Sequence, residues 1–138
     1  MKPENEKLID DFLAHADDLG DDIVEDVEEM IGVVPFIFAI LRDRPESFAL
    51  STLADYRISR PDSLDARTAE LIAVAAAASA GADSCLKVHM KAALKEGASR
   101  DEILDVLLIA AMIGKTRVLA SSLRRFREVC GEGPGAEK

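Results

Sequence analysis

Apolar side chains recur at intervals of three and four residues along almost the whole of this 138-residue chain. The clearest run lies near the start and consists of Leu8, Ile9, Phe12, Leu13, Ala16, Leu19, Ile23, Val27 and Met30. Such spacing gathers side chains on one face of an α-helix, whereas a strand needs alternation at every second residue. No segment alternates for long enough to predict a strand. We therefore expect an all-α fold, a helical bundle whose apolar faces pack together.

Glycines, prolines and capping residues divide this pattern into about six helices. The expected helices are 8–30, 35–41, 46–58, 64–80, 84–96 and 99–130. Asp83 is placed to cap the fifth, and Ser99 forms a capping box with Glu102 at the start of the sixth. Gly20 and Gly114 mark expected bends. We expect a single domain over residues 1–130 and a disordered tail over residues 131–138.

Charge is distributed unevenly and argues against several classes of partner. Residues 1–30 hold 12 Asp and Glu against two Lys, while the remainder of the chain is nearly neutral. An acidic first helix is unsuited to nucleic acid, because phosphate contacts require cations. No apolar run is long enough to span a bilayer, and the acidic start lacks the apolar core of a signal peptide. The cytoplasm is therefore the expected location.

The two cysteines, Cys85 and Cys130, lie 45 residues apart, and neither has a second cysteine at the spacing of a metal site. We expect no disulfide framework, no metal and no cofactor. In a reducing cytosol both side chains are free thiols. Cys130 lies among Arg and Glu residues near the chain end, where an incidental thiol is favoured over a resolving one.

Three residues could carry chemistry. Cys85 is expected at the second position of the helix 84–96, where the positive end of the helix dipole favours a thiolate, although Asp83 opposes this. His89 lies four residues later, hence on the same helical face. Glu70 lies on the preceding helix in an apolar surround, where a carboxylate needs a partner. The alternatives are a buried structural cysteine and a surface glutamate paired with Arg67.

The segment RTAELIAVAAAASAGADSCLKVHMKAALKEGASRDEI resembles the alkylhydroperoxidase-D-like branch of the carboxymuconolactone decarboxylase family. These proteins carry the pattern E-x11-C-x2-C-x3-H, and here Glu70, Cys85 and His89 occupy the glutamate, second-cysteine and histidine positions with unchanged spacing. The resemblance covers residues 63–111. It implies an all-helical fold and a reactive site at these three residues, with the glutamate and histidine as a proton relay.

The sequence departs from this pattern at the first cysteine, which is Ala82 here. In the resembled proteins the two cysteines form a redox couple that closes to a disulfide, and Ala82 removes that possibility. Ser84 also stands where some members carry a further histidine. The full peroxidase cycle is therefore not expected unmodified: an external thiol, or Cys130 of some chain, would have to resolve a sulfenic acid on Cys85.

Three functions remain open at this stage. The first is an antioxidant enzyme that reduces a small hydroperoxide through Cys85. The second is decarboxylation of a carboxymuconolactone-like ring acid by His89, with Lys87, Lys91 and Arg67 as candidate cations for the substrate. The third is a non-enzymatic assembly module in which the cysteine is merely buried. Under each we expect a homo-oligomer; the resemblance favours a trimer or hexamer.

Overall fold

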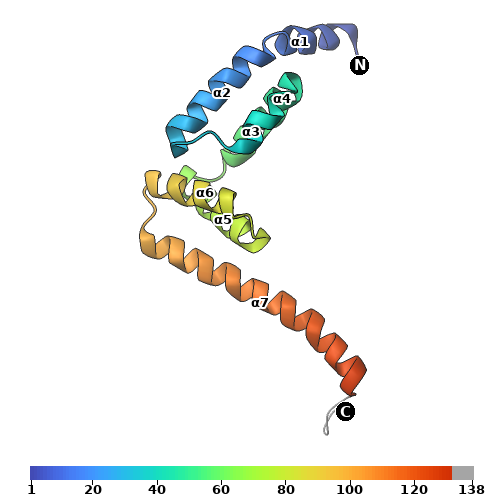
Figure 1. Ribbon diagram of the computed structural model, residues 1–138, viewed down its shortest axis with the longest axis vertical. Helices are drawn as coiled ribbons and strands as arrows, with labels where there is room; N and C mark the ends of the chain where they lie inside the picture. Colours follow the sequence, from blue (N-terminus) through green and yellow to red (C-terminus); the bar gives the residue numbers. More distant parts are fainter. Residues whose placement is uncertain (132–138) are drawn as a thin grey trace. The chain divides into compact units, whose positions relative to one another are not determined.

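The computed structural model describes residues 1–131 of the chain. Within this range it contains seven α-helices and no strand, which confirms the all-α prediction (Figure 1). The expected tail lies outside the described residues, apart from Gly131. The helices group into two compact units, Met1–Ala69 and the chain from Glu70 onward. Among the described residues, no helix combines the length and apolar character needed to cross a membrane.

The first unit contains α1 (Pro3–Leu13), α2 (Ala16–Ile31), α3 (Phe36–Leu41) and α4 (Pro45–Ser59). α2 and α3 both pack against α4. The expected single helix over 8–30 is wrong, because the chain breaks at residues 14 and 15, where no glycine or proline signals it. This break accounts for the seventh helix.

Gly20 lies inside α2 and does not end or interrupt it. A Cβ at this position would lie 3.3 Å from Cδ1 of Phe48 and would collide with the guanidinium of Arg42. The glycine therefore permits a close approach of neighbouring side chains, which is a different role from the expected bend.

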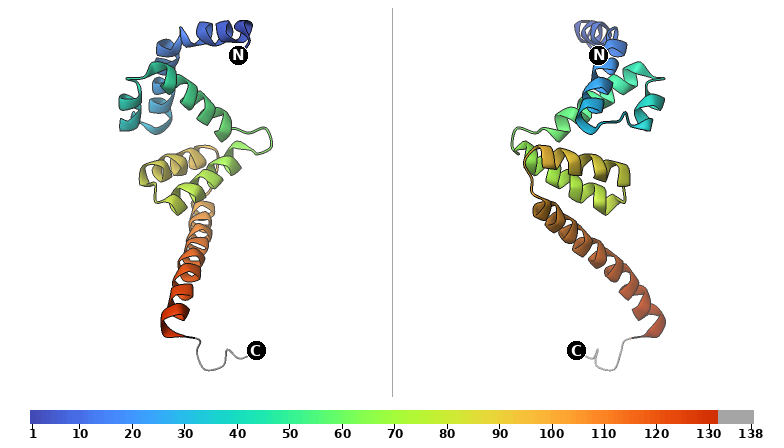
Figure 2. Two further views of the ribbon diagram at one scale, coloured as in Figure 1. Left: turned by 90° about the vertical axis from the view of Figure 1, so that its right-hand side faces the viewer. Right: turned by 60° about the vertical axis from the view of Figure 1, so that its left-hand side comes forward.

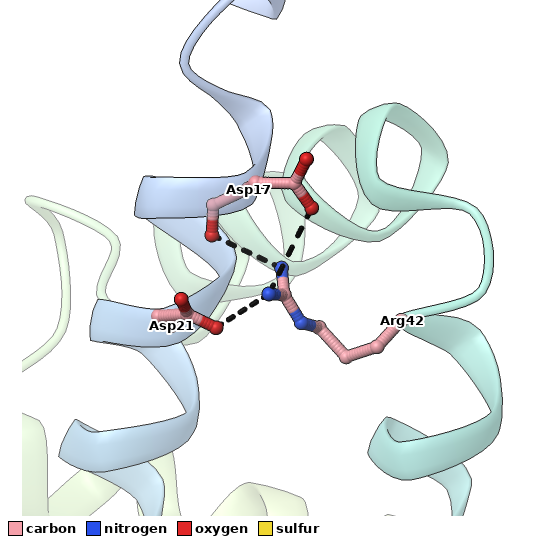
Figure 3. Close-up of polar contacts among 3 residues, drawn as sticks. All are labelled: Asp17, Asp21 and Arg42. Carbon is pink, nitrogen blue, oxygen red and sulfur yellow. Dashed lines mark hydrogen bonds and ion pairs between the residues drawn. The ribbon is translucent and has the colours of Figure 1, made fainter.

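Arg42, just after α3, is the residue that approaches Gly20. Its guanidinium contacts two carboxylates of α2: Nη2 lies 2.5 Å from Oδ1 of Asp21 and 3.9 Å from Oδ1 of Asp17 (Figure 3). Nη1 also donates to the backbone oxygen of Asp17 at 3.1 Å. The same guanidinium lies 5.7 Å from the ring centre of Phe48, a fully buried residue of α4. These contacts tie α2, α3 and α4 together.

The second unit is formed by most of α5 (Ala66–Ala80) together with α6 (Asp83–Lys95) and α7 (Arg100–Cys130). Gly81 lies in the turn between α5 and α6 with a φ of 68°, a left-handed conformation that suits glycine. The two helices run side by side in opposite directions in both views of Figure 2. α7 continues through Gly114 as one helix.

The core of this unit brings all three helices together. The buried residues Val74, Ala93, Ala98 and Ile103 form one cluster. Partly buried apolar side chains pack around it: Leu71, Leu86, Met90, Val106 and Leu107. This cluster packs α5 and α6 side by side.

Capping residues set where α6 and α7 begin. The expected capping box is confirmed: the Glu102 N–H donates to Ser99 Oγ at 3.1 Å, and the Ser99 N–H donates to Glu102 Oε2 at 2.8 Å. Asp83, by contrast, is the first residue of α6 and does not cap it. The N-cap is Ala82, which has no side chain able to accept a hydrogen bond.

α5 begins at Ala66, two residues later than expected, because Asp65 precedes it as a cap. Its carboxylate accepts hydrogen bonds from the backbone N–H and the hydroxyl of Thr68, both at 2.8 Å. These bonds favour the ionised form, so they lower the pKa of Asp65 below its ordinary value.

The stabilisation from Asp65 should depend on pH. Because the pKa is lower in the folded chain than in the unfolded one, the contribution is fully present above the unfolded value, near 4. It is lost as the pH falls through the folded value. We expect Asp65→Ala to lower the urea midpoint clearly at neutral pH and much less near pH 3. Asp62→Ala, in the same exposed loop, is the control, and equal losses at both pH values would contradict the prediction.

Candidate functional site

Glu70 is the one charged residue that is buried among those the structure describes. It lies in the second turn of α5, one turn before the core residue Val74 and on the same face. Only 3% of its surface is exposed, so the interpretation of Glu70 as a surface residue is wrong. A carboxylate in this position has lost most of its water and needs hydrogen bonds from the protein.

His89 provides one of those hydrogen bonds. Its Nδ1 lies 2.8 Å from Oε2 of Glu70, across the interface between α6 and α5. The histidine is partly open to solvent, with 30% of its side chain exposed, whereas the glutamate side chain is 4% exposed. The pair therefore has a buried acidic end and an accessible basic end.

The geometry of this pair decides which nitrogen of the ring can act on a substrate. An ionised carboxylate only accepts hydrogen bonds, so with ionised Glu70 the Nδ1 atom of His89 must donate. A neutral ring then carries its lone pair on Nε2. The arrangement fits a general base at Nε2, with a carboxylate that orients the ring and stabilises its protonated form.

Cys85 is exposed and lies at the third position of α6, one residue further into the helix than expected. It precedes His89 by four residues, so both side chains occupy one face of the helix. Among the described residues it has no hydrogen-bond partner, His89 included. A cysteine that served as a core hydrophobe would be buried, and Cys85 is not.

The first turn of α6 favours an anion near Cys85. Its N-cap, Ala82, offers no side-chain acceptor to the unpaired backbone N–H groups. The helix dipole adds positive potential at the same place, and Asp83 in the first turn opposes it. Cys85 therefore lies close to the backbone donors at the start of α6, with a carboxylate in the same turn that offsets part of their effect.

The structure thus brings Glu70 and His89 into contact and leaves Cys85 one helical turn away on an open surface. Arg67, the other candidate cation, is half-buried in the first turn of α5. Cys130 is exposed at the last residue of α7. Lys87, Lys91 and Ser84 are exposed on α6. In the described part of the chain, no three His, Cys, Asp or Glu side chains cluster closely enough to hold a metal ion.

Comparison with known proteins supplies one match. The model of the carboxymuconolactone decarboxylase family matches residues 45–128, more than half of the chain. The matched range includes Glu70, Cys85 and His89 and leaves α1, α2 and α3 outside. No curated protein and no solved structure gives a match.

Proposed function

Because the chain belongs to the carboxymuconolactone decarboxylase family, we propose that it is an enzyme that reduces a small hydroperoxide through Cys85. His89 and Glu70 serve as the proton relay. The observation that carries the proposal is the 2.8 Å contact between buried Glu70 and His89, one helical turn from an exposed thiol. The bond to Glu70 uses Nδ1 of His89 and leaves Nε2 available as the base that the proposal requires.

The first step oxidises the thiol. Nε2 of His89 accepts the proton of Cys85, and the thiolate attacks the outer oxygen of the hydroperoxide. The O–O bond breaks, the S–O bond forms, and the alkoxide leaves as an alcohol after it takes the proton from His89. Cys85 becomes a sulfenic acid.

The second step restores the thiol. An external thiol attacks the sulfur of the sulfenic acid, which releases water and forms a mixed disulfide. A second external thiol then breaks that disulfide and regenerates Cys85. Two electrons come from the two external thiols, so the cycle needs no cysteine at position 82. Such reductants are abundant in the cytoplasm, the proposed location.

The direct test is oxidation of the native protein by cumene hydroperoxide with a dithiol reductant. Before the reductant is added, we expect dimedone to trap one sulfenic acid per chain, at Cys85. With the reductant present, we expect steady consumption of peroxide. Cys85→Ser should abolish both, and Cys130→Ser, at the other exposed thiol, should leave both unchanged. A wild-type protein whose Cys85 stays reduced under excess peroxide would refute the proposal.

Decarboxylation of a small ring carboxylic acid is the second candidate, and one observation favours it. The Glu70–His89 pair is complete without Cys85, which has no hydrogen bond to it. His89 could then act on a substrate alone as a general acid and base. Cys85→Ser distinguishes the two functions: it would abolish peroxide reduction, whereas decarboxylation would persist. Decarboxylation would be lost when the imidazole of His89 is removed.

We also propose that the protein works as a homo-oligomer, with a trimer or hexamer expected from the family resemblance. The single chain carries many half-exposed large apolar side chains on α3 and α7, such as Phe36, Ile40 and Leu108. Burial of such side chains between copies is a common reason for their presence on a surface. The mass of the native protein in solution measures this.

A further inference from the structure

α7 is a 31-residue helix of which only the first part contributes to a core. Ile103, Val106, Leu107 and Ala110 lie on one face, and three of them belong to or pack against the core cluster. Beyond Ala110 no described residue of the helix is buried. In Figures 1 and 2, α7 runs on well past α5 and α6. The side chains in the second half of α7 therefore do not pack into the core of this unit.

A second apolar face runs along α7, on the side opposite its core-facing residues. It consists of Leu108, Met112, Leu119, Leu123 and Phe126. Each is between 46% and 61% exposed. The steps of four, seven, four and three residues keep these side chains in one line along the helix. We call this face the outer stripe of α7.

A groove of suitable character lies between α2 and α4. Three aliphatic side chains, Ile23, Val27 and Leu53, line it together with Thr52, Asp26 and Tyr56. The volume is about 220 Å³. A cavity of about 150 Å³ is enough for benzene, so this groove has room for large apolar side chains from a partner.

Charge makes the groove and the stripe complementary. α2 contains eight Asp and Glu and no Lys or Arg, and Asp26 is part of the groove lining. The second half of α7 is basic: residues 115–130 hold five Lys and Arg against one Glu. Lys115 lies one turn before Leu119 on the side of the outer stripe. Opposite charges at the edges of an apolar contact steer the partners together and set the register.

We propose that the outer stripe of α7 in one copy of the chain docks into the α2–α4 groove of a second copy. Leu119 and Leu123, one turn apart, occupy the groove, and Lys115 lies beside Asp26. Pairing of two outer stripes, α7 against α7, is disfavoured because both helices are basic and repel each other. The inference concerns an interface and does not depend on the chemistry of Cys85.

Sedimentation of the full-length protein over concentrations from about 1 to 100 μM tests the interface. We expect the wild type to associate and Leu119→Ala to weaken association at least about tenfold, as for an apolar anchor at the centre of an interface. Val118→Ala is the matched control, since Val118 is no less exposed than Leu119 but lies off the outer stripe. Both residues are exposed and alanine favours helix, so circular dichroism should show folded proteins.

Charge reversal identifies the groove itself. Asp26→Lys and Lys115→Glu should each weaken association. The double variant should recover most of the wild-type affinity, because the two positions again carry opposite charges, now exchanged. Glu28→Lys, a charge reversal at an exposed α2 residue on the opposite side of the helix from Asp26, is the control. A monomeric wild type, an unchanged Leu119→Ala, or a double variant weaker than both singles would overturn the proposal.

Discussion

Glu70→Gln should slow the oxidation of Cys85 by peroxide by roughly 10²- to 10⁴-fold, the range found when a proton relay is disabled. Glutamine has the same size as glutamate, and its oxygen can still accept the hydrogen bond from Nδ1 of His89. It carries no negative charge, so the imidazolium that forms when His89 takes the thiol proton loses its stabilising partner. The rate of sulfenic acid formation, followed by stopped flow with dimedone trapping, measures the effect.

A matched control separates charge at the site from charge on the surface. Glu96→Gln removes an exposed carboxylate just after α6 and should leave the oxidation rate unchanged. His89→Asn offers a second test, because its amide can still donate to Glu70 while Nε2 is lost. We expect it to be as slow as Glu70→Gln. If both variants oxidised at the wild-type rate, the Glu70–His89 pair would be a structural hydrogen bond only.

Folding has to be monitored separately in these variants. Glu70 is buried, and a neutral amide removes the cost of burying a charge, so Glu70→Gln should unfold at a urea concentration similar to that of the wild type or higher. A fall in rate at unchanged stability then reports on proton transfer. Glu70→Ala is less informative, because it would leave Nδ1 of His89 without this acceptor and open a cavity.

Ala82→Cys should raise peroxide-dependent oxidation of a dithiol by roughly tenfold or more, because an intramolecular thiol replaces a bimolecular step. Ala82 is the N-cap of α6 and Cys85 its third residue. At the equivalent positions of α7, the side chains of Ser99 and Glu102 each reach the backbone N–H of the other residue, so a side chain at the N-cap lies beside the third residue of the helix. A new thiol at position 82 would therefore lie close enough to resolve the sulfenic acid on Cys85.

The structural cost of this change should be small. Ala82 is only partly buried, and the substitution adds one sulfur atom, so overpacking should cost no more than about 1–3 kcal/mol. After one equivalent of peroxide, mass spectrometry of the variant should show an internal disulfide between the introduced thiol and Cys85 in place of the sulfenic acid. Ala82→Ser is the control, since it adds an atom without a thiol. A disulfide that forms without a gain in turnover would favour the decarboxylase or the non-enzymatic function.

The sequence alone predicted most of the helices, because their signals are local. Apolar periodicity, Gly81 after an alanine-rich run, and the Ser99–Glu102 pair each act within a few residues. Two helix boundaries differ from the prediction. The start of α5 depends on the Asp65 cap, a local contact that the sequence does not distinguish from its neighbours. The break after Leu13 has no glycine or proline to signal it. Gly20 was misread because its neighbours, Arg42 and Phe48, come from elsewhere in the chain.

Part of the candidate site could likewise be predicted from the sequence, and part depends on the tertiary structure. Cys85 and His89 could be named from their spacing, since an i, i+4 relation on a helix fixes them on one face. Glu70 was named from its apolar surround and from the resemblance to the family pattern. Spacing cannot tell whether a glutamate nineteen residues before a histidine touches it. The packing of α5 on α6 around Val74 and Ala93 decided that: it buried Glu70, brought its Oε2 atom to 2.8 Å from Nδ1 of His89, and left Cys85 exposed. Burial and contact between helices depend on the whole core, which no local pattern encodes.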